Sequence, residues 1–357
     1  MPDTQSFDYP AALPDTGTAS TPMPGPLRVS VVVPTCGRPM LLQRCLSSLM
    51  VQQFDTRQFE IVVVDDACHA DASRATRAVM QACMAQAAMH GVQLRLLGPY
   101  PPDAAHGPAA ARNRGWRHAR GTIIAFTDDG TQARNDWLAC GMDAFEDEGV
   151  DAVWGRISVP LHGPATDYER DAKGLEQAEF VTANCFCRRT LLARINGFDE
   201  RFALAWRADA DLYFRLLDAV ARIVHVPEAV VVHPIRPARW GVSMAQQRKI
   251  VFDALLFKKH PGRYREKIRA GPCIDYYIVV ACLVGAIAFA LAGRYAMALA
   301  ALVAWTWLSA RFCLRRLRPT IKTTPHVIEM LVTSALIPPL AVFWRVVGML
   351  RFRVGFL

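Results

Sequence analysis

The sequence predicts an α/β fold with a doubly wound, mostly parallel sheet, followed by C-terminal transmembrane helices. Between residues 28 and 232, short β-branched runs alternate with longer amphipathic segments, the pattern of repeated β-α-β units. Two of these runs end in paired aspartates, Asp65-Asp66 and Asp128-Asp129. Ligands of open α/β sheets bind at such carboxyl ends of strands. After residue 232, long apolar stretches replace the alternation.

The order of strands and helices follows from the individual runs. Strands are expected at residues 29–33, 59–64, 94–97 and 122–127, each a short apolar run bounded by polar residues. Pro39 suits the first turn of a helix whose apolar face is Leu42, Cys45, Leu46 and Leu49. Asp71 is placed to cap a second helix that runs to about His90, and Pro108 begins a third that reaches about Ala119.

Charge is unevenly distributed along the chain. The 357 residues carry a net charge of +9 and are 52% hydrophobic, enough for one large domain or two smaller ones. From Lys258 onward there are 15 basic residues against 3 acidic ones, leaving 26 of the 41 basic and 29 of the 32 acidic residues for the rest. Basic residues beside apolar stretches suit an anionic membrane surface, so we expect a membrane partner and no nucleic acid.

Two apolar stretches, residues 276–292 and 295–310, predict a transmembrane hairpin. Basic residues follow it directly, at Arg311, Arg315, Arg316, Arg318 and Lys322. By the positive-inside rule this loop and the preceding body are cytoplasmic, which predicts a multi-pass protein of the plasma (inner) membrane. A third stretch, 330–344, is interrupted by Pro338-Pro339 and is expected to be re-entrant, interfacial or spanning. The competing interpretation, buried helices of a soluble domain, is disfavoured by the uncharged hairpin.

These patterns divide the chain into six parts. Residues 1–27 are rich in Pro, Thr, Asp and Ala and predict a disordered leader. The parts that follow are an α/β domain at 28–232, a connector with juxtamembrane helices at 233–275, the hairpin at 276–310, a basic cytoplasmic loop at 311–326 and the third apolar segment at 327–357.

Carboxylates at the strand ends predict a metal or nucleotide site. The oxygens of Asp128 and Asp129 suit Mg²⁺ or Mn²⁺, and such an ion neutralises a departing diphosphate. The alternative is a turn, because Asp-Asp-Gly is also a favourable turn sequence. Arg112, near the start of a helix rich in small residues, suits a phosphate neighbour, and a merely solvated arginine fits the pattern equally.

A third acidic set consists of Asp209 and Asp211, two residues apart. On a helix these side chains point in different directions, so one can face the cleft while the other caps the helix or pairs with Arg215. A cleft carboxylate can serve as the base that deprotonates a hydroxyl nucleophile. The alternative is an ordinary first helical turn, where acidic residues favour the dipole.

The order of the motifs is more specific than any one of them. Along the chain come Ser-Val-Val-Val-Pro-Thr, Val-Val-Val-Asp-Asp, Ala-Ala-Arg-Asn-x-Gly, a further Asp-Asp after a strand, Gly-Phe-Asp-Glu and Asp-x-Asp-Leu-x-x-Arg-Leu. This series resembles the family 2 glycosyltransferases of GT-A fold over roughly residues 28–236. The resemblance implies an inverting transfer of sugar from a nucleotide diphosphate-sugar donor to a hydroxyl acceptor.

The resemblance also implies roles for individual residues. The nucleotide-sugar side would comprise Pro34, Thr35, Asp65, Asp66, Arg112, Asn113 and Asp128. Asp129, helped by Asp128, would bind Mg²⁺ or Mn²⁺ at the diphosphate, and Asp209 would be the catalytic base.

Three departures from the family pattern accompany the resemblance. Gly130 stands where many members have a third Asp, and Ala208 stands where many have Glu before the base. Processive polymerases of the family carry Gln-x-x-Arg-Trp, whereas this chain has Arg236-Pro-Ala-Arg-Trp240. We therefore expect a transferase that adds a single sugar.

The connector after the α/β domain mixes cationic and aromatic side chains, at His233, Arg236, Arg239 and Trp240. Close to a membrane surface these groups suit the leaving diphosphate or an anionic lipid-linked acceptor, with lipid headgroups as the alternative. Asn184 and Asp211 are the other residues expected on the acceptor side.

These features predict an inverting glycosyltransferase that acts on a glycan or polyprenyl-linked acceptor at the cytoplasmic membrane face, in cell-surface polysaccharide synthesis. A nucleotidyltransferase usually needs a Gly-rich basic loop after its first strand, and residues 34–38 are too short for one. A dinucleotide-binding oxidoreductase would need Gly-x-Gly-x-x-Gly there. A catalytically inactive membrane-bound partner in polysaccharide assembly remains the alternative, because of Gly130 and Ala208.

Overall fold

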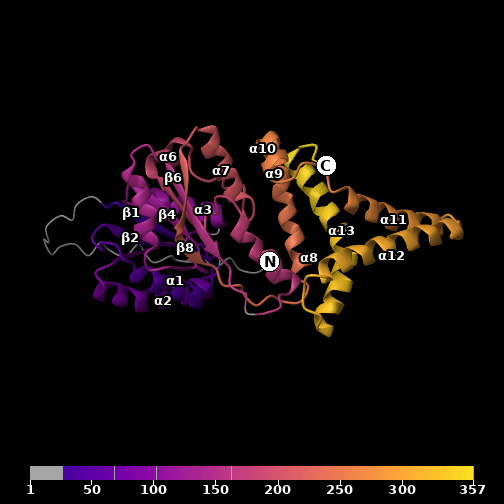
Figure 1. The fold of residues 1–357 in the computed structure, drawn as a ribbon, viewed down its shortest axis with the longest axis horizontal. Helices are drawn as coiled ribbons and strands as arrows, with labels where there is room; N and C mark the ends of the chain where they lie inside the picture. The colour runs from indigo at the N-terminus through magenta and orange to yellow at the C-terminus, as the bar shows by residue number, and fades with distance from the viewer. Residues whose placement is uncertain (1–26, 68, 102, 162, 357) are drawn as a thin grey trace, which may run out of the picture.

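The computed structural model describes residues 27–67, 69–101, 103–161 and 163–356, and it has the α/β architecture that the sequence predicts. The predicted leader lies outside the described residues, apart from Leu27. Figure 1 shows an α/β body at one end of the molecule and a helical hairpin extending from the other, with further helices between them.

One eight-stranded sheet forms the centre of the body, in the order β3-β2-β1-β4-β7-β6-β8-β5. The strands are β1 (Val29–Thr35), β2 (Phe59–Asp65), β3 (Gln93–Leu97), β4 (Ile123–Thr127), β5 (Gln132–Ala133), β6 (Ala152–Ser158), β7 (Asn184–Arg188) and β8 (Ile223–Val232). The four predicted strands are confirmed and pair in parallel, as do β6 and β8. The short strands β7 and β5 run antiparallel to their neighbours, so the sheet is mixed but mostly parallel.

Helices cover the sheet and continue into the C-terminal region. Those of the body are α1 (Pro39–Met50), α2 (Ala70–Met89), α3 (Pro108–His118), α4 (Trp137–Asp143), α5 (Asp167–Lys173), α6 (Arg189–Arg194) and α7 (Ala208–Asp218). Those that follow are α8 (Val242–Gln246), α9 (Val251–Lys259), α10 (Pro261–Lys267), α11 (Ile274–Leu291), α12 (Tyr295–Leu317) and α13 (Thr324–Phe352). Short 3₁₀ turns lie at Ala144–Glu146, Gly174–Gln177 and Gln247–Ile250.

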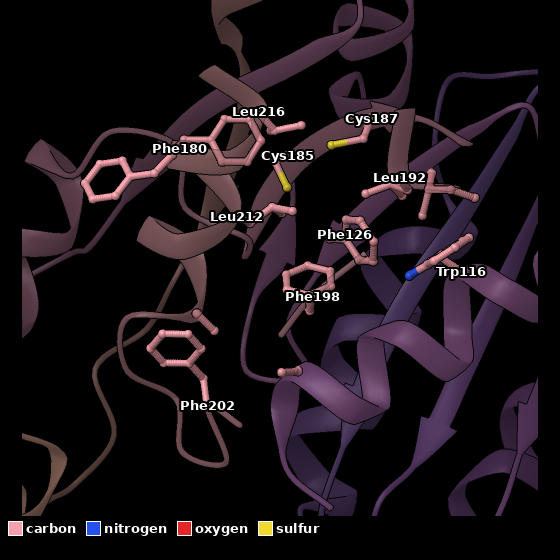
Figure 2. Close-up of a cluster of buried hydrophobic side chains, with 14 of the residues drawn as sticks. Trp116, Phe126, Phe180, Cys185, Cys187, Leu192, Phe198, Phe202, Leu212 and Leu216 are labelled. Atoms are coloured by element: carbon pink, nitrogen blue, oxygen red, sulfur yellow. The ribbon is translucent and has the colours of Figure 1, made fainter. Parts of the chain in front are cut away.

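The sheet separates two hydrophobic cores, because successive side chains of a strand point to opposite faces. Val31 of β1 belongs to the core that also contains Leu42, on the predicted apolar face of α1, and that face is confirmed. Val32 belongs to the opposite core, with Trp116 of α3 and Leu212 of α7. Figure 2 shows part of this second core, in which α3 and α7 pack against one face of the sheet.

The predicted N-cap of α2 is wrong. His69 occupies the cap position, and Asp71 is the second residue of the helix. An acidic residue in the first turn still interacts favourably with the helix dipole, which explains why the pattern resembled a cap.

The hairpin α11–α12 extends away from the body (Figure 1). Together with α13, these are three helices long and apolar enough to cross a membrane, with mean hydropathies of 2.2, 1.5 and 1.8. The predicted basic loop at 311–326 is partly wrong, because α12 continues to Leu317. Arginine has a good helix propensity and is favourable in a last turn, so the basic residues extend the helix rather than end it.

The third apolar segment is one continuous helix, α13, and the predicted interruption at Pro338-Pro339 does not occur. Helices tolerate an internal proline where neighbouring elements support them, and Pro338 is on the buried side of α13. Figure 1 shows α13 running across the base of the hairpin, beside α9.

The two faces of α13 have an unusual distribution of polarity. Its buried face includes the polar residues His326, Thr333, Ser334 and Arg345. Its exposed face carries the large apolar residues Ile328, Leu331, Val332, Leu336, Phe343, Val346 and Leu350. This is the reverse of an amphipathic helix on a water-soluble protein, and it fits a helix whose outer face contacts lipid.

Candidate active site

The predicted strand-end residues meet at one edge of the sheet. Strands β1, β2 and β4 are parallel neighbours, so their carboxyl ends lie together. The Thr35 hydroxyl, at the end of β1, donates to Asp129 Oδ2 over 2.9 Å, and the Asp66 backbone N–H donates to the Thr35 carbonyl oxygen over 2.9 Å. Thr35, which follows Pro34, therefore links the ends of the three strands, with Asp66 on one side and Asp129 on the other.

Asp128 and Asp129 are each held by an arginine. Arg112 of α3 contacts Asp128 Oδ1 at 2.5 Å, and Arg38 contacts Asp129 Oδ1 at 3.1 Å. Burial opposes ionisation of Asp128, but the charges of Arg112 and His233 hold its pKa below the usual value. Burial raises the pKa of Asp129, and Arg38 and the Thr35 hydroxyl only partly offset this. Adjacent carboxyls thus have opposite pKa shifts.

Asp209 joins this acidic pair from the first turn of α7. The Thr182 hydroxyl donates to Asp209 Oδ1 over 2.5 Å. Burial raises the pKa of Asp209, opposed mainly by the charge of Arg112, and Asp128 adds to the rise. The guanidinium charge of Arg112 therefore interacts with both carboxylates, Asp128 and Asp209. Its guanidinium is buried, and its Nε has no hydrogen-bond partner in the described part of the chain. We call Asp128, Asp129 and Asp209 the strand-end cluster.

The side chain of Asp211 points away from the strand-end cluster, as a spacing of two residues on a helix allows. It accepts from Arg215 at 2.9 Å and from His260 Nε2 at 3.1 Å, and Lys259 lies 2.5 Å away. Burial opposes its ionisation, but these partners hold its pKa below the usual value. The expectation that Asp211 lies on the acceptor side is wrong, because it anchors α7 to α9 instead.

Asp65 and Asp66 organise the end of β2. Asp65 is buried and accepts from the Ser73 hydroxyl at 2.6 Å, which ties β2 to α2. Asp66 accepts from the Gly107 backbone N–H at 2.7 Å and pairs with Arg114 at 3.1 Å. These contacts fix the loop before α3 against the strand end.

Asn113 has a positioning role. Its amide nitrogen donates to the Phe198 carbonyl at 2.9 Å and to Glu200 at 2.7 Å. Its amide oxygen accepts from the Phe198 N–H at 2.8 Å and from Trp116 Nε1 at 2.9 Å. All four hydrogen-bonding positions of the amide are used, leaving none for a nucleotide. A Cβ at Gly197, where φ is +60°, would meet the amide oxygen of Asn113 at 2.4 Å. The Ala-Arg-Asn motif and the glycine of the Gly-Phe-Asp-Glu motif therefore pack directly against each other.

Asn184 also has a structural role. It is fully buried, its oxygen accepts from Trp137 Nε1 at 2.8 Å, and its nitrogen donates to the carbonyls of Arg156 and Ala229 at 2.9 and 2.8 Å. It therefore joins β7 to β6 and β8. The expectation that Asn184 lines the acceptor side is wrong.

The connector after β8 passes the strand-end cluster. The positive charge of His233 contributes to the lowered pKa of Asp128, and that of Arg236 opposes the rise at Asp129. Trp240 lies further along and is exposed. The structure thus brings His233 and Arg236 near the acidic pair.

Sequence reasoning missed two residues of the site, Arg38 and Thr182. Arg38 follows Gly37, which has a φ of +62° and turns the chain after β1. The short Gly-Arg segment directly after a strand was a usable signal for Arg38. Thr182 meets Asp209 from 27 residues away, and nothing in its local sequence marks it.

The acidic pair can contribute two carboxylates to a metal ion. Within the described residues, no three His, Cys, Asp or Glu side chains are grouped so as to hold one. A Cβ built at Gly130 would have no heavy atom within 4 Å, so the position of the family's frequent third Asp is open space here. Carboxylate oxygens fit Mg²⁺ or Mn²⁺, which commonly take their remaining ligands from water and substrate phosphates.

Comparisons with known proteins agree with this geometry. Residues 30–198 match glycosyl transferase family 2. The chain is therefore similar to this family over a little under half of its length. It is 24% identical over 231 residues to glycosyltransferase AglE of Haloferax volcanii, covering 62% of this chain and 71% of that protein.

A second relative, and a solved structure, extend the comparison. The GalNAc(5)-diNAcBac-PP-undecaprenol β-1,3-glucosyltransferase of Campylobacter jejuni is 28% identical over 170 residues, covering 48% of this chain and 49% of that protein. The chain therefore spans about half the length of this relative. The mannosyltransferase PcManGT of Pyrobaculum calidifontis, solved with GDP-Man and Mn²⁺, has a TM-score of 0.54 at 21% identity, covering 89% of this chain and 87% of that chain. The predicted GT-A fold is confirmed.

Proposed function

We propose that this glycosyltransferase is an inverting enzyme that transfers one sugar from a nucleotide diphosphate-sugar to a hydroxyl of a glycan or lipid-linked acceptor. The observation that carries the proposal is the strand-end cluster, in which Asp209, a partly buried carboxyl with a raised pKa, shares Arg112 with Asp128. This arrangement supports the proposal because Asp209 would act as the base beside Arg112, which would bind the diphosphate.

In this mechanism Asp209 removes the proton of the acceptor hydroxyl. The acceptor oxygen forms a bond to the anomeric carbon, and the bond from that carbon to the diphosphate oxygen breaks. The nucleotide diphosphate leaves with the electron pair of the broken bond. Thr182, which donates to Asp209 over 2.5 Å, fixes the carboxylate for this transfer. The buried Nε of Arg112, which lacks a partner among the described residues, is available to the diphosphate.

Asp128 and Asp129 would hold Mg²⁺ or Mn²⁺ beside the donor. Such an ion, when bound, supplies Lewis-acid stabilisation of the diphosphate charge. Arg38, which contacts Asp129 Oδ1 at 3.1 Å, would share this carboxylate with the ion. Burial raises the pKa of Asp129 and Arg38 only partly offsets the rise, so a bound cation would further stabilise the ionised form. Pro34, Thr35 and Asp66 lie beside the acidic pair and would contact the base and ribose, while the buried Asp65 would support them through its contact with Ser73.

The acceptor is expected at the membrane, on its cytoplasmic face. The Campylobacter relative is named for a PP-undecaprenol substrate. Arg316, at the basic end of α12, pairs with Asp167 of α5 at 2.6 Å, so the basic end of the hairpin and the catalytic body lie on the same side. By the positive-inside rule that side is the cytoplasm. In this arrangement α11 and α12 span the plasma (inner) membrane, and α13 lies along its surface with its apolar face in lipid.

The test measures turnover of a nucleotide diphosphate-sugar by the full chain in detergent, as hydrolysis without an acceptor and as sugar transfer when an acceptor is present. We expect Mn²⁺-stimulated turnover of one donor that is abolished in Asp129→Asn and retained in Asp136→Asn, a control aspartate that pairs with Arg134 outside the cluster. Binding of a donor without any turnover, in the presence of membrane lipid extract as acceptor, would instead support the inactive assembly partner.

A further inference from the structure

A cavity of about 340 Å³ lies where the catalytic body meets the C-terminal helices. Its walls are the start of α5 (Thr166 to Glu169), the connector from Ile235 to Ser243, and the first turns of α13 (His326 to Met330). Its size is within the range of small-ligand sites in proteins. It lies outside the strand-end cluster, and one of its lining residues, Arg236, connects the two places.

The acidic residues around the cavity already have partners. Asp167 pairs with Arg316 at 2.6 Å. Glu169 closes the N-terminus of α5 by accepting from the Thr166 backbone N–H at 2.7 Å. Glu329 accepts from the Gly241 backbone N–H at 2.8 Å. Each carboxylate therefore has a structural contact that stabilises its charge.

Two arginines of the cavity and one imidazole nitrogen are not matched in this way, although Nδ1 of His326 lies 4.0 Å from Glu329 Oε2. Arg236 and Arg239 line it, and within the described residues neither has an acidic group within ion-pair distance. His326 is 5% exposed, and its Nε2 is buried without a hydrogen-bond partner in the described structure. A buried polar atom without a partner costs free energy, about 1–3 kcal/mol in proteins, unless a ligand or water satisfies it.

Lys249 lies near the cavity residue Arg236. Burial lowers the pKa of Lys249, the charge of Asp171 opposes this shift, and the charge of Arg236 adds to it. Arg236 is also close enough to Asp129 to oppose the rise in that residue's pKa. Cationic groups thus extend from the cavity to the strand-end cluster, a path along which an anionic group is favourable.

Resting on the proposed function, we propose that this cavity binds the phosphate or diphosphate group of a lipid-linked acceptor through Arg236, Arg239 and His326. The position of the cavity favours the phosphate of a lipid over that of a free nucleotide. Helix α13 forms one wall of the cavity and exposes apolar side chains along its outer face. A prenyl chain leaves the cavity along that face, and the acceptor sugar extends from the phosphate past Arg236 toward Asp209. Arginine and histidine donors suit phosphate oxygens in this role.

The test measures binding of farnesyl diphosphate to the full chain in phosphatidylcholine nanodiscs, where no anionic bilayer lipid competes. Calorimetry is run on the wild type, Arg239→Gln, His326→Gln and the control Arg248→Gln, which neutralises an exposed arginine of the connector region outside the cavity. We expect equal binding to the wild type and the control, and at least about tenfold weaker binding to the two cavity variants. UDP and GDP affinities with Mn²⁺, measured on the same samples, should not change.

Three outcomes would overturn the inference. Equal affinity of all four proteins for farnesyl diphosphate would exclude the cavity, and equally tight binding of farnesol would show that no phosphate is recognised. A parallel loss of nucleotide affinity in both cavity variants would assign the cavity to the donor. Absence of nucleotide binding in the wild type is a different result, since it contradicts the proposed function itself. Inorganic diphosphate competing with farnesyl diphosphate on the wild type supports the inference without any variant.

Discussion

Asp209 and Asp211 lie two residues apart on α7 and have opposite environments. Asp209 belongs to the strand-end cluster, and burial raises its pKa. Asp211 is paired with Arg215, Lys259 and His260, which lower its pKa despite burial. The first turn of α7 thus carries Asp209 at the proposed catalytic site and Asp211 in the ion-pair cluster that holds α7 against α9.

The difference shows how one motif serves both function and stability. A buried carboxylate without full charge compensation destabilises the folded state but is a better proton acceptor at neutral pH. A buried carboxylate with several cations contributes no reactivity but fixes the orientation of its helix. We infer that Asp211 holds α7 so that Asp209 reaches the acceptor. Each prediction below separates these two roles.

The largest expected effect is on turnover in Asp209→Asn. Loss of the base should lower kcat by about 10²–10⁴, with donor affinity nearly unchanged. Because asparagine carries no buried charge and can still accept from Thr182, the melting temperature should equal or exceed that of the wild type. Steady-state kinetics, donor calorimetry and thermal unfolding check the three parts. A variant with weak donor binding but normal turnover would place Asp209 in a structural role.

Asp211→Asn should mainly affect stability. Removing one partner of a buried ion-pair cluster costs about 3–5 kcal/mol of unfolding free energy. Because the folded pKa of Asp211 is lowered, its contribution is present above the unfolded value of about 3.9 and is lost as pH falls through the folded pKa. The stability difference between wild type and variant should therefore shrink in acid. A chemical denaturation series at several pH values measures this. Equal stability at neutral pH would contradict the anchor role.

The pH dependence of turnover should report the raised pKa of Asp209. The base is active only when deprotonated, so kcat should fall, as pH decreases, at a higher pH than an ordinary aspartate would give. The acid limb of the kcat profile, measured at saturating donor and acceptor, checks this. The residual activity of Asp209→Asn should lack that limb, and an identical limb in the variant would assign it to another group.

The smallest effect is expected for Gly130→Asp, which restores the third carboxylate frequent in the family. A Cβ there meets no heavy atom within 4 Å, so unfolding free energy should change by less than about 0.5 kcal/mol. An added carboxylate beside Asp129 should lower the Mn²⁺ concentration needed for half-maximal donor binding. Gly174→Asp, at another glycine with open space around its Cβ, serves as the control. An unchanged Mn²⁺ requirement would argue against a metal at the acidic pair.

Local sequence patterns were sufficient for the four strands β1 to β4 and for the acidic strand ends. Each strand is a short run whose end is visible in the sequence, so Asp65, Asp128 and Asp129 were placed correctly at one edge of the sheet. The antiparallel strand β7 was not predicted, because its pairing with β4 depends on residues about 60 positions away.

Side-chain partners were the part that sequence could not supply. Asn113 and Asn184 look like polar candidates in isolation, but their amides are used by Phe198 and Ala229, 85 and 45 residues away. For the same reason the sequence left open which of Asp209 and Asp211 faces the cleft. The continuity of α13 through its two prolines likewise depends on packing against the body, which no local pattern records.

The most direct test of the account is a donor-binding screen on the purified full chain. Calorimetry with UDP-, GDP- and dTDP-sugars, each with and without Mn²⁺, asks whether the strand-end cluster is a nucleotide-sugar site. We predict metal-dependent binding of one donor, weakened in Asp129→Asn and unchanged in Asp211→Asn at a temperature where that variant is folded. No binding of any donor to folded wild-type protein would contradict the account and favour an inactive partner in polysaccharide assembly.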